Sequence, residues 1–318
     1  MKKQSFITYV AMAFFSLLLV NCISDDDNTP SVAADSYGSV SELVENLKPT
    51  AQTFTLNPTI AQTITGSKGT VIEIGPDTFT GNDGVALTTP IIASLKEYLS
   101  LEDMILGNVQ TASNGQLLIT GGSYDLTFTD ENGNDINVNN WNIQSKIPVE
   151  TDITGYETNM QYYTGDTTTI DNREVVNWDL GQAEAWMSDG VFNILGAEQG
   201  LSNCDALYNM AGENGTQFEV TVPGVTDYSN TTVWLIIEDF PSVVMVYTLN
   251  DTEDALTTYD ASIPMGLNAT LVAITIDEDN YLSFGSLAIT VSGDDTFSVP
   301  VNYGTTAELV SLVGTLTN

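Results

Sequence analysis

The sequence predicts a mainly β fold made of two β-sandwich domains with short flanking helices. Short runs rich in Thr, Val and Ile alternate with Gly, Asn and Asp along most of the chain, which is typical of strands and their turns. Signals for helices appear in only three short segments after the N-terminal region. The chain has two cysteines among 318 residues, so we expect the fold to rest on burial of apolar surface and not on disulfides.

Residues 1–21 have the features of a secretory signal. Lys2 and Lys3 precede an almost unbroken apolar stretch from Phe6 to Val20, about fifteen residues long. This stretch is too short to span a bilayer comfortably and matches the hydrophobic region of an export signal. A buried core helix is the alternative, but the position behind two lysines favours export.

The signal ends at a cysteine. The run from Leu19 to Cys22, "LVNC", resembles a bacterial lipobox, in which the cysteine thiol is acylated and the cysteine becomes the new N-terminus. The resemblance implies that residues 1–21 are a lipoprotein signal peptide and that Cys22 carries the lipid anchor. Each buried methylene of an acyl chain contributes roughly 0.8 kcal/mol to membrane binding. Outer-membrane lipid is therefore the first expected partner.

An acidic run directly follows this cysteine. It consists of Ser24, Asp25, Asp26 and Asp27. Such a run is usually a solvated tail, but behind a lipidated cysteine it resembles the export signal of Bacteroidetes surface lipoproteins. The resemblance implies display on the outer leaflet of the outer membrane, facing the cell exterior. The periplasmic face of that membrane is the alternative.

The chain is strongly acidic. It has 42 Asp and Glu against 7 Lys and Arg, and a formal net charge of −35. Loss of Lys2 and Lys3 with the signal would leave five cations against 42 acids and a charge of −37. The five are Lys48, Lys68, Lys96, Lys146 and Arg173. Nucleic acid is excluded as a partner because phosphate binding needs clustered cations, and we expect saline surroundings or bound divalent cations to make the charge tolerable.

Several kinds of catalytic site are excluded by composition. The chain has no His, which removes Cys–His pairs, Ser-His-Asp triads and the commonest zinc ligands. Cys204 is therefore expected to be a small buried hydrophobic residue. The phosphate-binding glycine motifs are also missing. We expect no cofactor, no metal site and no catalytic residue, and we predict that the protein is not an enzyme.

Residues 22–50 are predicted to form an acidic flexible tether followed by a short helix, because polar residues dominate the segment before residue 39. Three helices are predicted from residues that cap a helix N-terminus, at residue 39, in "SLEDMILG" and at the C-terminus. The pairs are Ser39 with Glu42, Ser100 with Asp103, and Thr305 with Glu308.

Residues 51–150 are predicted to form the first β domain. Thr70–Ile74 and Leu117–Ile119 have the composition of strands. The segment 123–139 is predicted to be a hairpin that turns at Asn132-Gly133.

Two segments of this domain resemble a recurrent domain of Bacteroidetes lipoproteins. They are Gly66–Phe79, "GSKGTVIEIGPDTF", and Ser94–Gly122. The first is similar to the start of ZU5-type β-sandwich domains, which are interaction modules. The resemblance implies a flavobacterial surface-lipoprotein family of unsettled function, with a ZU5-like domain at residues 51–150. Some ZU5-type domains cleave themselves at a site that contains His, and this chain has none.

Residues 151–204 are interpreted as a connecting region with a few short strands. Aromatic residues, including Trp178 and Trp186, alternate there with polar turn residues. These two tryptophans could stack on sugar rings at an exposed surface. Packing between the two domains is favoured, because that is where their large apolar area stabilises the fold most.

Residues 205–318 are predicted to form an immunoglobulin-like β-sandwich with a C-terminal helix. About seven short runs have the length and spacing of strands in such a sandwich. Two of them, "VWLIIED" and "SVVMVYTL", are continuously apolar, as expected for strands covered on both faces. The seven runs are Gln217–Val222, Thr231–Glu238, Val243–Leu249, Ala255–Asp260, Ala269–Ile276, Tyr281–Leu287 and Thr296–Val301.

Two patterns leave a chemical alternative open. The loop Asp130–Asp135, "DENGND", offers oxygens that Ca2+ could use, although Gly133 lies one position early for an EF-hand and a polar turn is the favoured interpretation. Pairs of carboxylates can hydrolyse glycosides. With 42 acidic residues, such pairs also arise by chance.

We therefore expect a lipid-anchored, surface-exposed outer-membrane lipoprotein that acts as a non-catalytic structural, adhesive or binding module. Besides lipid at Cys22, the partner considered is an extracellular glycan or protein. The alternative is a glycan-binding accessory protein or a carboxylate-based glycan-degrading enzyme at the cell surface. A deep pocket with two carboxylates beside Trp178 or Trp186 would favour that alternative, whereas flat surfaces would favour the binding module.

Overall fold

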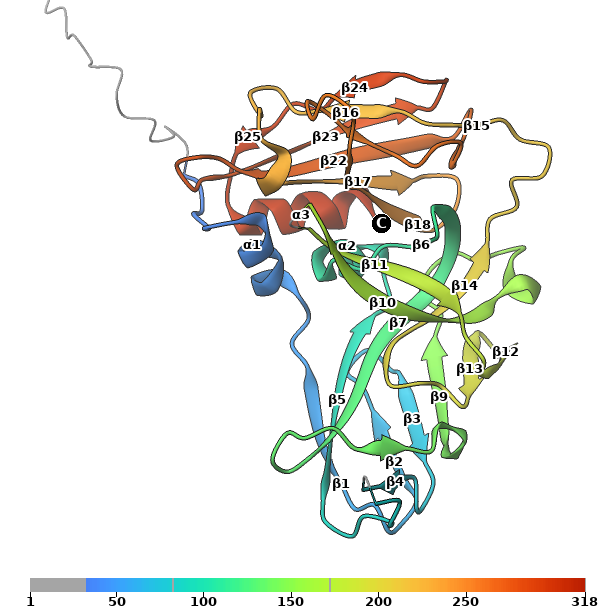
Figure 1. Ribbon diagram of the computed structural model, residues 1–318. Coiled ribbons are helices and arrows are strands. Elements are labelled where there is room, and N and C mark those ends of the chain that lie inside the picture. Colours follow the sequence, from blue (N-terminus) through green and yellow to red (C-terminus); the bar gives the residue numbers. More distant parts are fainter. Residues whose placement is uncertain (1–32, 82, 172, 318) are drawn as a thin grey trace, which may run out of the picture.

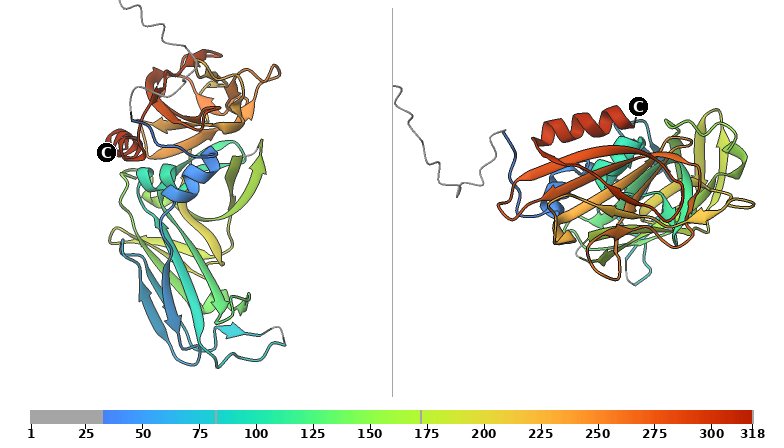
Figure 2. Two further views of the ribbon diagram at one scale, coloured as in Figure 1. Left: turned by 90° about the vertical axis from the view of Figure 1, so that its left-hand side faces the viewer. Right: turned by 90° about the horizontal axis from the view of Figure 1, so that it is seen from above.

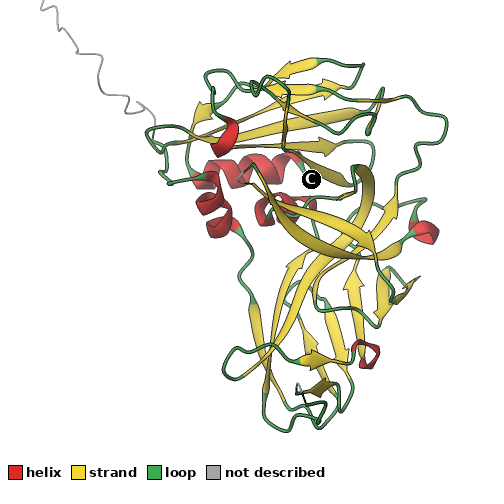
Figure 3. Ribbon diagram, viewed as in Figure 1, coloured by secondary structure: helices red, strands yellow, loops and turns green. Residues whose placement is uncertain are grey.

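The structure is a computed structural model that describes residues 33–81, 83–171 and 173–317. Cys22 and the acidic run Ser24–Asp27 lie outside the described residues. The fold is mainly β, with 47% strand and 12% helix, several antiparallel sheets and three short α-helices (Figures 1 and 3), which confirms the predicted class. In the described part of the chain, no helix combines the length and the hydrophobicity that a membrane crossing requires.

The first unit, residues 52–207, packs two antiparallel sheets against each other. The larger sheet has the order β1 (Gln52–Leu56), β5 (Ile91–Tyr98), β7 (Gln116–Asp130), β14 (Gly200–Leu207), β10 (Gln161–Ile170) and β11 (Arg173–Leu180), and β6 (Ala112–Ser113) pairs with β7. The smaller sheet has the order β12 (Glu184–Ser188), β13 (Val191–Leu195), β9 (Ile143–Pro148), β3 (Val71–Ile74) and β2 (Gln62–Thr65). The buried hydroxyls of Tyr124 in β7 and Ser145 in β9 are hydrogen-bonded at 2.8 Å, which joins the two sheets through the core.

The segment 151–204 is part of this first unit. It supplies β10, β11 and β14 to the larger sheet and β12 and β13 to the smaller one, which goes beyond the connecting region that the sequence predicts. A short 3-10 helix, η2 (Glu157–Asn159), precedes β10. Polar turns such as Ser188-Asp189-Gly190 separate strands of only five residues, β12 and β13, and this hides their regularity in the sequence.

The predicted hairpin at residues 123–139 is wrong beyond its turn. Gly133 does adopt a left-handed backbone, with φ 81°, at the expected position. Only one bridge, between Thr129 and Asp135, continues the pairing, and the following strand β8 (Asn137–Val138) pairs with β4 (Phe79–Thr80). β14 occupies this edge of β7 as far as Leu126, and the N–H of Phe128 donates to the Gln199 side chain at 3.0 Å, which leaves little of the edge for the second strand of a hairpin.

The second unit, residues 215–303, contains two more sheets. One has the order β18 (Ser242–Val246), β17 (Thr231–Ile237), β22 (Asn268–Ile276), β23 (Leu282–Thr290) and β25 (Asn302–Tyr303). The other has the order β19 (Thr248–Leu249), β20 (Leu256–Thr257), β16 (Glu219–Thr221) and β24 (Thr296–Ser298), and β15 (Gly215–Thr216) pairs with β21 (Ile263–Pro264). A 3-10 helix, η3 (Tyr228–Asn230), leads into β17. Each of the seven predicted runs overlaps at least one of these strands, and β17 and β18 are buried at every residue, as predicted.

Three short helices lie where the two units meet (Figures 1 and 2). They are α1 (Val40–Leu47), α2 (Leu101–Gly107) and α3 (Thr306–Leu316). The predicted capping boxes are complete at α2 and α3. At α1 the Ser39 hydroxyl accepts from the Glu42 N–H at 3.1 Å, and the Glu42 carboxylate accepts from the N–H of Gly38 instead of Ser39.

The two units share an apolar cluster that we call the junction cluster. Leu43 of α1, Met104 of α2 and Leu309 of α3 belong to it together with Trp178 of β11 and Trp234 of β17, and all five are buried. The helices therefore cover the face of β17 and β22 that the second unit does not use for its own core. The edge of β18 is closed as well, because the carbonyl of Val243 accepts from the N–H of Thr111 at 2.7 Å.

The first described residues run along the second unit. Ser36 forms a bridge with Tyr281, and the Asp35 carboxylate accepts from the N–H of Thr306 at 2.7 Å, at the start of α3. The described chain therefore begins on the second unit and then crosses, through α1, to the first (Figure 1).

Candidate functional site

Two acidic hollows lie on the second unit. One, of about 730 Å3, is lined by the carboxylates of Glu219, Asp251, Asp294 and Asp295. The other, of about 610 Å3, is lined by those of Asp227, Asp277, Glu278 and Asp279. Among the described lining residues neither hollow contains a tryptophan. The structure thus does not bring Trp178 or Trp186 together with the carboxylates of a pocket.

Trp178 is a structural residue. Its side chain is fully buried in the junction cluster, and its indole N–H donates to the carbonyl of Gln110 at 2.6 Å. The Gln110 side chain in turn accepts from the N–H of Met245 in the second unit at 3.1 Å. Packing between the two units, the interpretation favoured from the sequence, is confirmed for this tryptophan.

Trp186 lies instead on an open sheet surface and is 42% exposed. The register of the smaller sheet of the first unit places it directly opposite Asn193 of β13, and Asn193 directly opposite Lys146 of β9. Residues opposite one another in adjacent strands share a face of the sheet. Trp186 therefore points to the side away from the core.

We call this side the outer face. Its outward residues are Thr63 and Thr65 of β2, Val71 and Glu73 of β3, Gln144, Lys146 and Pro148 of β9, Val191, Asn193 and Leu195 of β13, and Glu184, Trp186 and Ser188 of β12. The alternate residues of the same strands, such as Ile72, Ile147 and Phe192, are fully buried in the core. No helix or strand covers the outer face in the described part of the chain (Figure 1).

A second exposed tryptophan lies at the edge of the outer face. Trp141, in the 3-10 helix η1 (Asn140–Asn142), is 56% exposed. A Cβ atom built on Gly196 would lie 2.9 Å from this indole ring, so one side of the ring rests directly on the glycine backbone. Gly196 also has φ 92°, a conformation that other residues adopt only with strain. Trp141 was missed by sequence reasoning, because only a lone aromatic in the run "NNWN" marks it.

Trp141 borders a shallow hollow of about 490 Å3 on the outer face. Gln144, Glu73 and Leu195 line it, and these three lie in one row across the sheet. The side-chain amide of Gln144 has no hydrogen-bond partner among the described residues. The hollow therefore combines an apolar ring with polar groups that are free to bind a ligand.

The charges of the outer face nearly cancel. Its only charged residues are Glu73, Lys146 and Glu184, and the Lys146 ammonium lies 2.5 Å from the Glu73 carboxylate. The other described lysines are paired too: Lys48 with Glu45 and Glu174, Lys68 with Asp103, and Lys96 with Asp125. No lysine of the described chain is therefore free to receive an anionic ligand.

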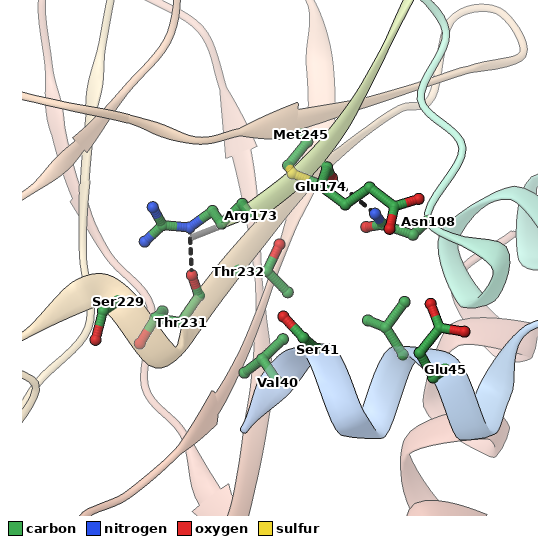
Figure 4. A pocket seen from close by; sticks show the side chains of 11 residues that line it. Val40, Ser41, Glu45, Asn108, Arg173, Glu174, Ser229, Thr231, Thr232 and Met245 are labelled. Carbon is green, nitrogen blue, oxygen red and sulfur yellow. Dashed lines mark hydrogen bonds between the residues drawn. The ribbon is translucent and has the colours of Figure 1, made fainter. Parts of the chain in front are cut away.

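Arg173, the fifth cation, joins the two units (Figure 4). Its guanidinium is buried and donates to the carbonyl of Thr231 at 2.8 Å and to the carbonyl of Tyr228. Burial lowers its pKa from the usual value for arginine. The adjacent cavity between α1, β11 and β17 measures about 40 Å3, which holds at most a few water molecules. This cavity belongs to the packing of the junction.

The "DENGND" loop is an internally bonded turn. One oxygen of the Asp130 carboxylate accepts from the N–H groups of Asn132 and Asn134 at 2.8 and 2.9 Å, and the other accepts from the Asn134 side chain at 2.8 Å. The bonds from Asn134 lower the pKa of Asp130. In the described ranges, no group of three or more acidic, Cys or His residues is arranged to hold a metal ion.

A buried carboxyl group adjoins Cys204. Cys204 is fully buried, as predicted, and so is the next residue, Asp205. One Asp205 oxygen accepts from the Asn203 side chain at 2.5 Å, and the other has no partner among the described residues. Burial raises the pKa of Asp205 well above its usual range. Sequence reasoning missed this residue, because its burial arises from β14 being covered on both faces between Ser202 and Ala206.

Comparisons with known proteins supply no site that can be transferred. No protein-family model, no curated protein and no solved structure matches this chain. The outer face is therefore the candidate site on its own geometry: two exposed indoles, free polar groups and balanced charge on a rigid sheet.

Proposed function

We propose that this protein is a lipid-anchored lipoprotein of the outer membrane that faces the cell exterior and acts as a non-catalytic binding module. The anchor is the acylated Cys22, and the run Ser24–Asp27 acts as its export signal. The flavobacterial lipoprotein family is the proposed origin, with a ZU5-like first domain and an immunoglobulin-like second one. The observation that carries the binding function is the uncovered outer face with Trp141 and Trp186.

The position of this face supports the proposal. The described chain begins on the second unit, where Asp35 contacts the start of α3. The outer face belongs to the first unit, at the other end of the molecule (Figure 1). An anchor that precedes residue 33 would thus hold the second unit nearer the membrane and present the outer face to the surroundings.

A carboxylate-based glycan-degrading enzyme is the second candidate. The acidic hollows of the second unit provide neighbouring carboxylates, which is the only observation in its favour. The two exposed tryptophans lie on the other unit, so that a chain bound to them would not reach these carboxylates, and the exposed aromatic residue that lines one of the hollows is Tyr303. The binding module accounts for the exposed tryptophans, whereas the enzyme does not.

Cell fractionation tests the anchor. In cells that express the full chain, the wild-type protein is expected in the outer-membrane fraction and accessible to antibody on intact cells. Cys22→Ser is expected to release it from the membrane, while Cys204→Ala, at the buried cysteine, leaves the location unchanged. Retention of the Cys22→Ser variant in the membrane, processed as in wild type, would contradict the proposal.

An assay for reducing ends tests the non-catalytic part. The mature chain with Cys22→Ser, incubated with soluble polysaccharides, is expected to release no new reducing ends. Release that is abolished by Asp294→Asn or Asp277→Asn would establish the enzyme instead.

A further inference from the structure

The geometry points to an uncharged glycan chain as the ligand of the outer face, with Trp141 and Trp186 as two stacking platforms. This inference rests on the function proposed above and names its ligand class. A pyranose ring presents C–H groups on its faces and hydroxyls around its rim. A binding surface for such a chain needs flat apolar rings for the faces and free hydrogen-bonding groups for the rim.

Trp141 is held as a rigid platform. Because Gly196 has no side chain, the indole lies against its backbone, with closest distances of 2.9 to 3.2 Å to the position a Cβ would take. This contact covers one side of the ring, while the residue as a whole remains 56% exposed. Little side-chain entropy is then lost when a ligand stacks on the open side.

Trp186 supplies the second platform on the same face. It lies opposite Asn193, which is only 8% exposed although its side chain points outward. Trp186 and Lys146 flank Asn193 on the two neighbouring strands. Asn193 and Gly196, the residues that the two indoles adjoin, are three positions apart, which corresponds to roughly 10 Å along the strand direction. A chain of a few sugar residues can contact both.

Polar groups lie between and beside the platforms. Gln144 and Thr63 belong to the row next to Trp186, and neither side chain has a hydrogen-bond partner among the described residues. Their amide and hydroxyl groups both donate and accept, as sugar hydroxyls do. Their position in the hollow of about 490 Å3 beside Trp141 places them at the rim of a stacked ring.

Charge selects an uncharged ligand. An acidic polysaccharide would meet a chain of formal charge −35 on which each described lysine is already paired. A cationic ligand would be drawn to the acidic hollows of the second unit. The outer face, with Lys146 and Glu73 in mutual contact, neither repels nor attracts charge strongly.

The composition of the face also disfavours a protein partner. Stable protein interfaces bury a continuous apolar centre and about 800 Å2 on each partner. The outer face also carries Val71, Pro148, Val191 and Leu195, and these apolar residues and the two indoles are interrupted by Gln144, Asn193 and the Lys146 ion pair. Apolar groups interspersed with polar ones match a ligand that is itself alternately apolar and polar.

Affinity electrophoresis tests the inference. The mature chain with Cys22→Ser is run through gels that contain neutral polysaccharides (β-glucan, xylan, mannan, dextran) or acidic ones (alginate, polygalacturonate). We expect retardation by at least one neutral polymer and by neither acidic one. Trp141→Ala and Trp186→Ala should each weaken binding about tenfold, since one aromatic contact is worth ~1.5 kcal/mol, and the double variant should abolish it.

Matched variants separate stacking from unfolding. Tyr303→Ala removes an exposed aromatic from the second unit and should leave binding unchanged. Trp186→Phe keeps a ring and should retain most of the affinity. All variants should keep the wild-type circular dichroism spectrum.

Three results would overturn the inference: no retardation by any neutral polymer, retardation only by acidic ones, or unchanged binding by the double variant. If the protein is surface-displayed through Cys22 and still binds no neutral polymer, the ligand class fails while the proposed location stands. If a neutral polymer binds through the two tryptophans and Cys22→Ser does not alter the location, the proposed location fails while the ligand class stands.

Discussion

The two five-stranded sheets of this protein differ in what lies on the side away from their own cores. In the second unit, the side of β17 and β22 that carries Trp234, Ile236, Val272 and Ile274 is apolar, and three helices and the first unit cover it. In the first unit, the outer face mixes polar residues with two exposed indoles and the half-buried Val71, Pro148, Val191 and Leu195, and nothing in the described chain covers it. The covered side of the second unit's sheet serves to join the two units, whereas the outer face of the first unit is left open. This difference indicates that the exposed tryptophans are not remnants of an incomplete core.

The largest effect should come from truncating the covered side. Trp234→Ala removes an indole that is 1% exposed and should lower the free energy of unfolding by about 3–5 kcal/mol. Trp186→Ala on the outer face is the matched control and should cost less than about 1 kcal/mol, because the lost contacts are partly with solvent. Urea unfolding of both variants measures the difference. If both variants lost the same free energy of unfolding, the outer face would be as important for stability as the covered side, and the two sheets would not differ in the way described.

A second prediction concerns the cation that joins the units. Arg173→Met leaves the carbonyls of Thr231 and Tyr228 without their buried donor and should cost about 3 kcal/mol of stability. Arg173→Lys should recover only part of this loss, since an ammonium cannot reproduce the geometry of the guanidinium. Thermal unfolding gives the ranking. A variant Arg173→Met as stable as wild type would show that the junction cluster alone holds the units together.

A third prediction contrasts the buried carboxyl group of Asp205 with the carboxylates at the surface. The pKa of Asp205 is raised by burial, so the folded state keeps a proton that the unfolded state releases above its ordinary pKa of 3.8. The stabilisation that comes from the raised pKa of Asp205 is fully present below pH 3.8. It is lost by about 1.4 kcal/mol per pH unit as the pH rises toward the pKa of Asp205 in the folded state.

The variant Asp205→Asn should abolish this part of the pH dependence and raise stability at neutral pH. Denaturant unfolding between pH 4 and neutrality checks the sign. If the free energy of unfolding of wild type and of Asp205→Asn instead rises by the same amount over this range, Asp205 is ionised in the folded state. Asp130→Asn, at an exposed turn, serves as the control at a carboxylate whose pKa is lowered.

The helices and the apolar strands were predictable because their determinants are local. A capping box involves residues three positions apart, so Ser100 with Asp103 and Thr305 with Glu308 specify where α2 and α3 begin. The continuous apolar runs of β17 and β18 likewise imply burial on both faces. What covers them, three helices and an edge of the first unit, depends on contacts between residues far apart in the sequence.

Strand partners and the candidate site were not predictable for the same reason. The sequence cannot show that β8 pairs with β4, because most of the edge of β7 that β8 would need is taken by β14 and Gln199, from a distant part of the chain. Trp141 resembles any aromatic residue in a polar loop until Gly196, more than fifty positions later, is found beneath it. Asp205 follows a cysteine in an ordinary strand, and nothing local shows that both faces of this part of β14 are covered.

The pairing of all four described lysines has a practical consequence for work on intact cells. Lys96 and Lys146 lie within strands, Lys48 ends a helix and Arg173 is buried, which leaves Lys68, in the exposed turn between β2 and β3, as the basic residue of the described chain that trypsin can reach most readily. Trypsin used on intact cells therefore has few accessible sites on this protein, and resistance to trypsin would not show that the protein lies inside the cell. A protease of broad specificity, or an antibody, is the reagent that can report its topology.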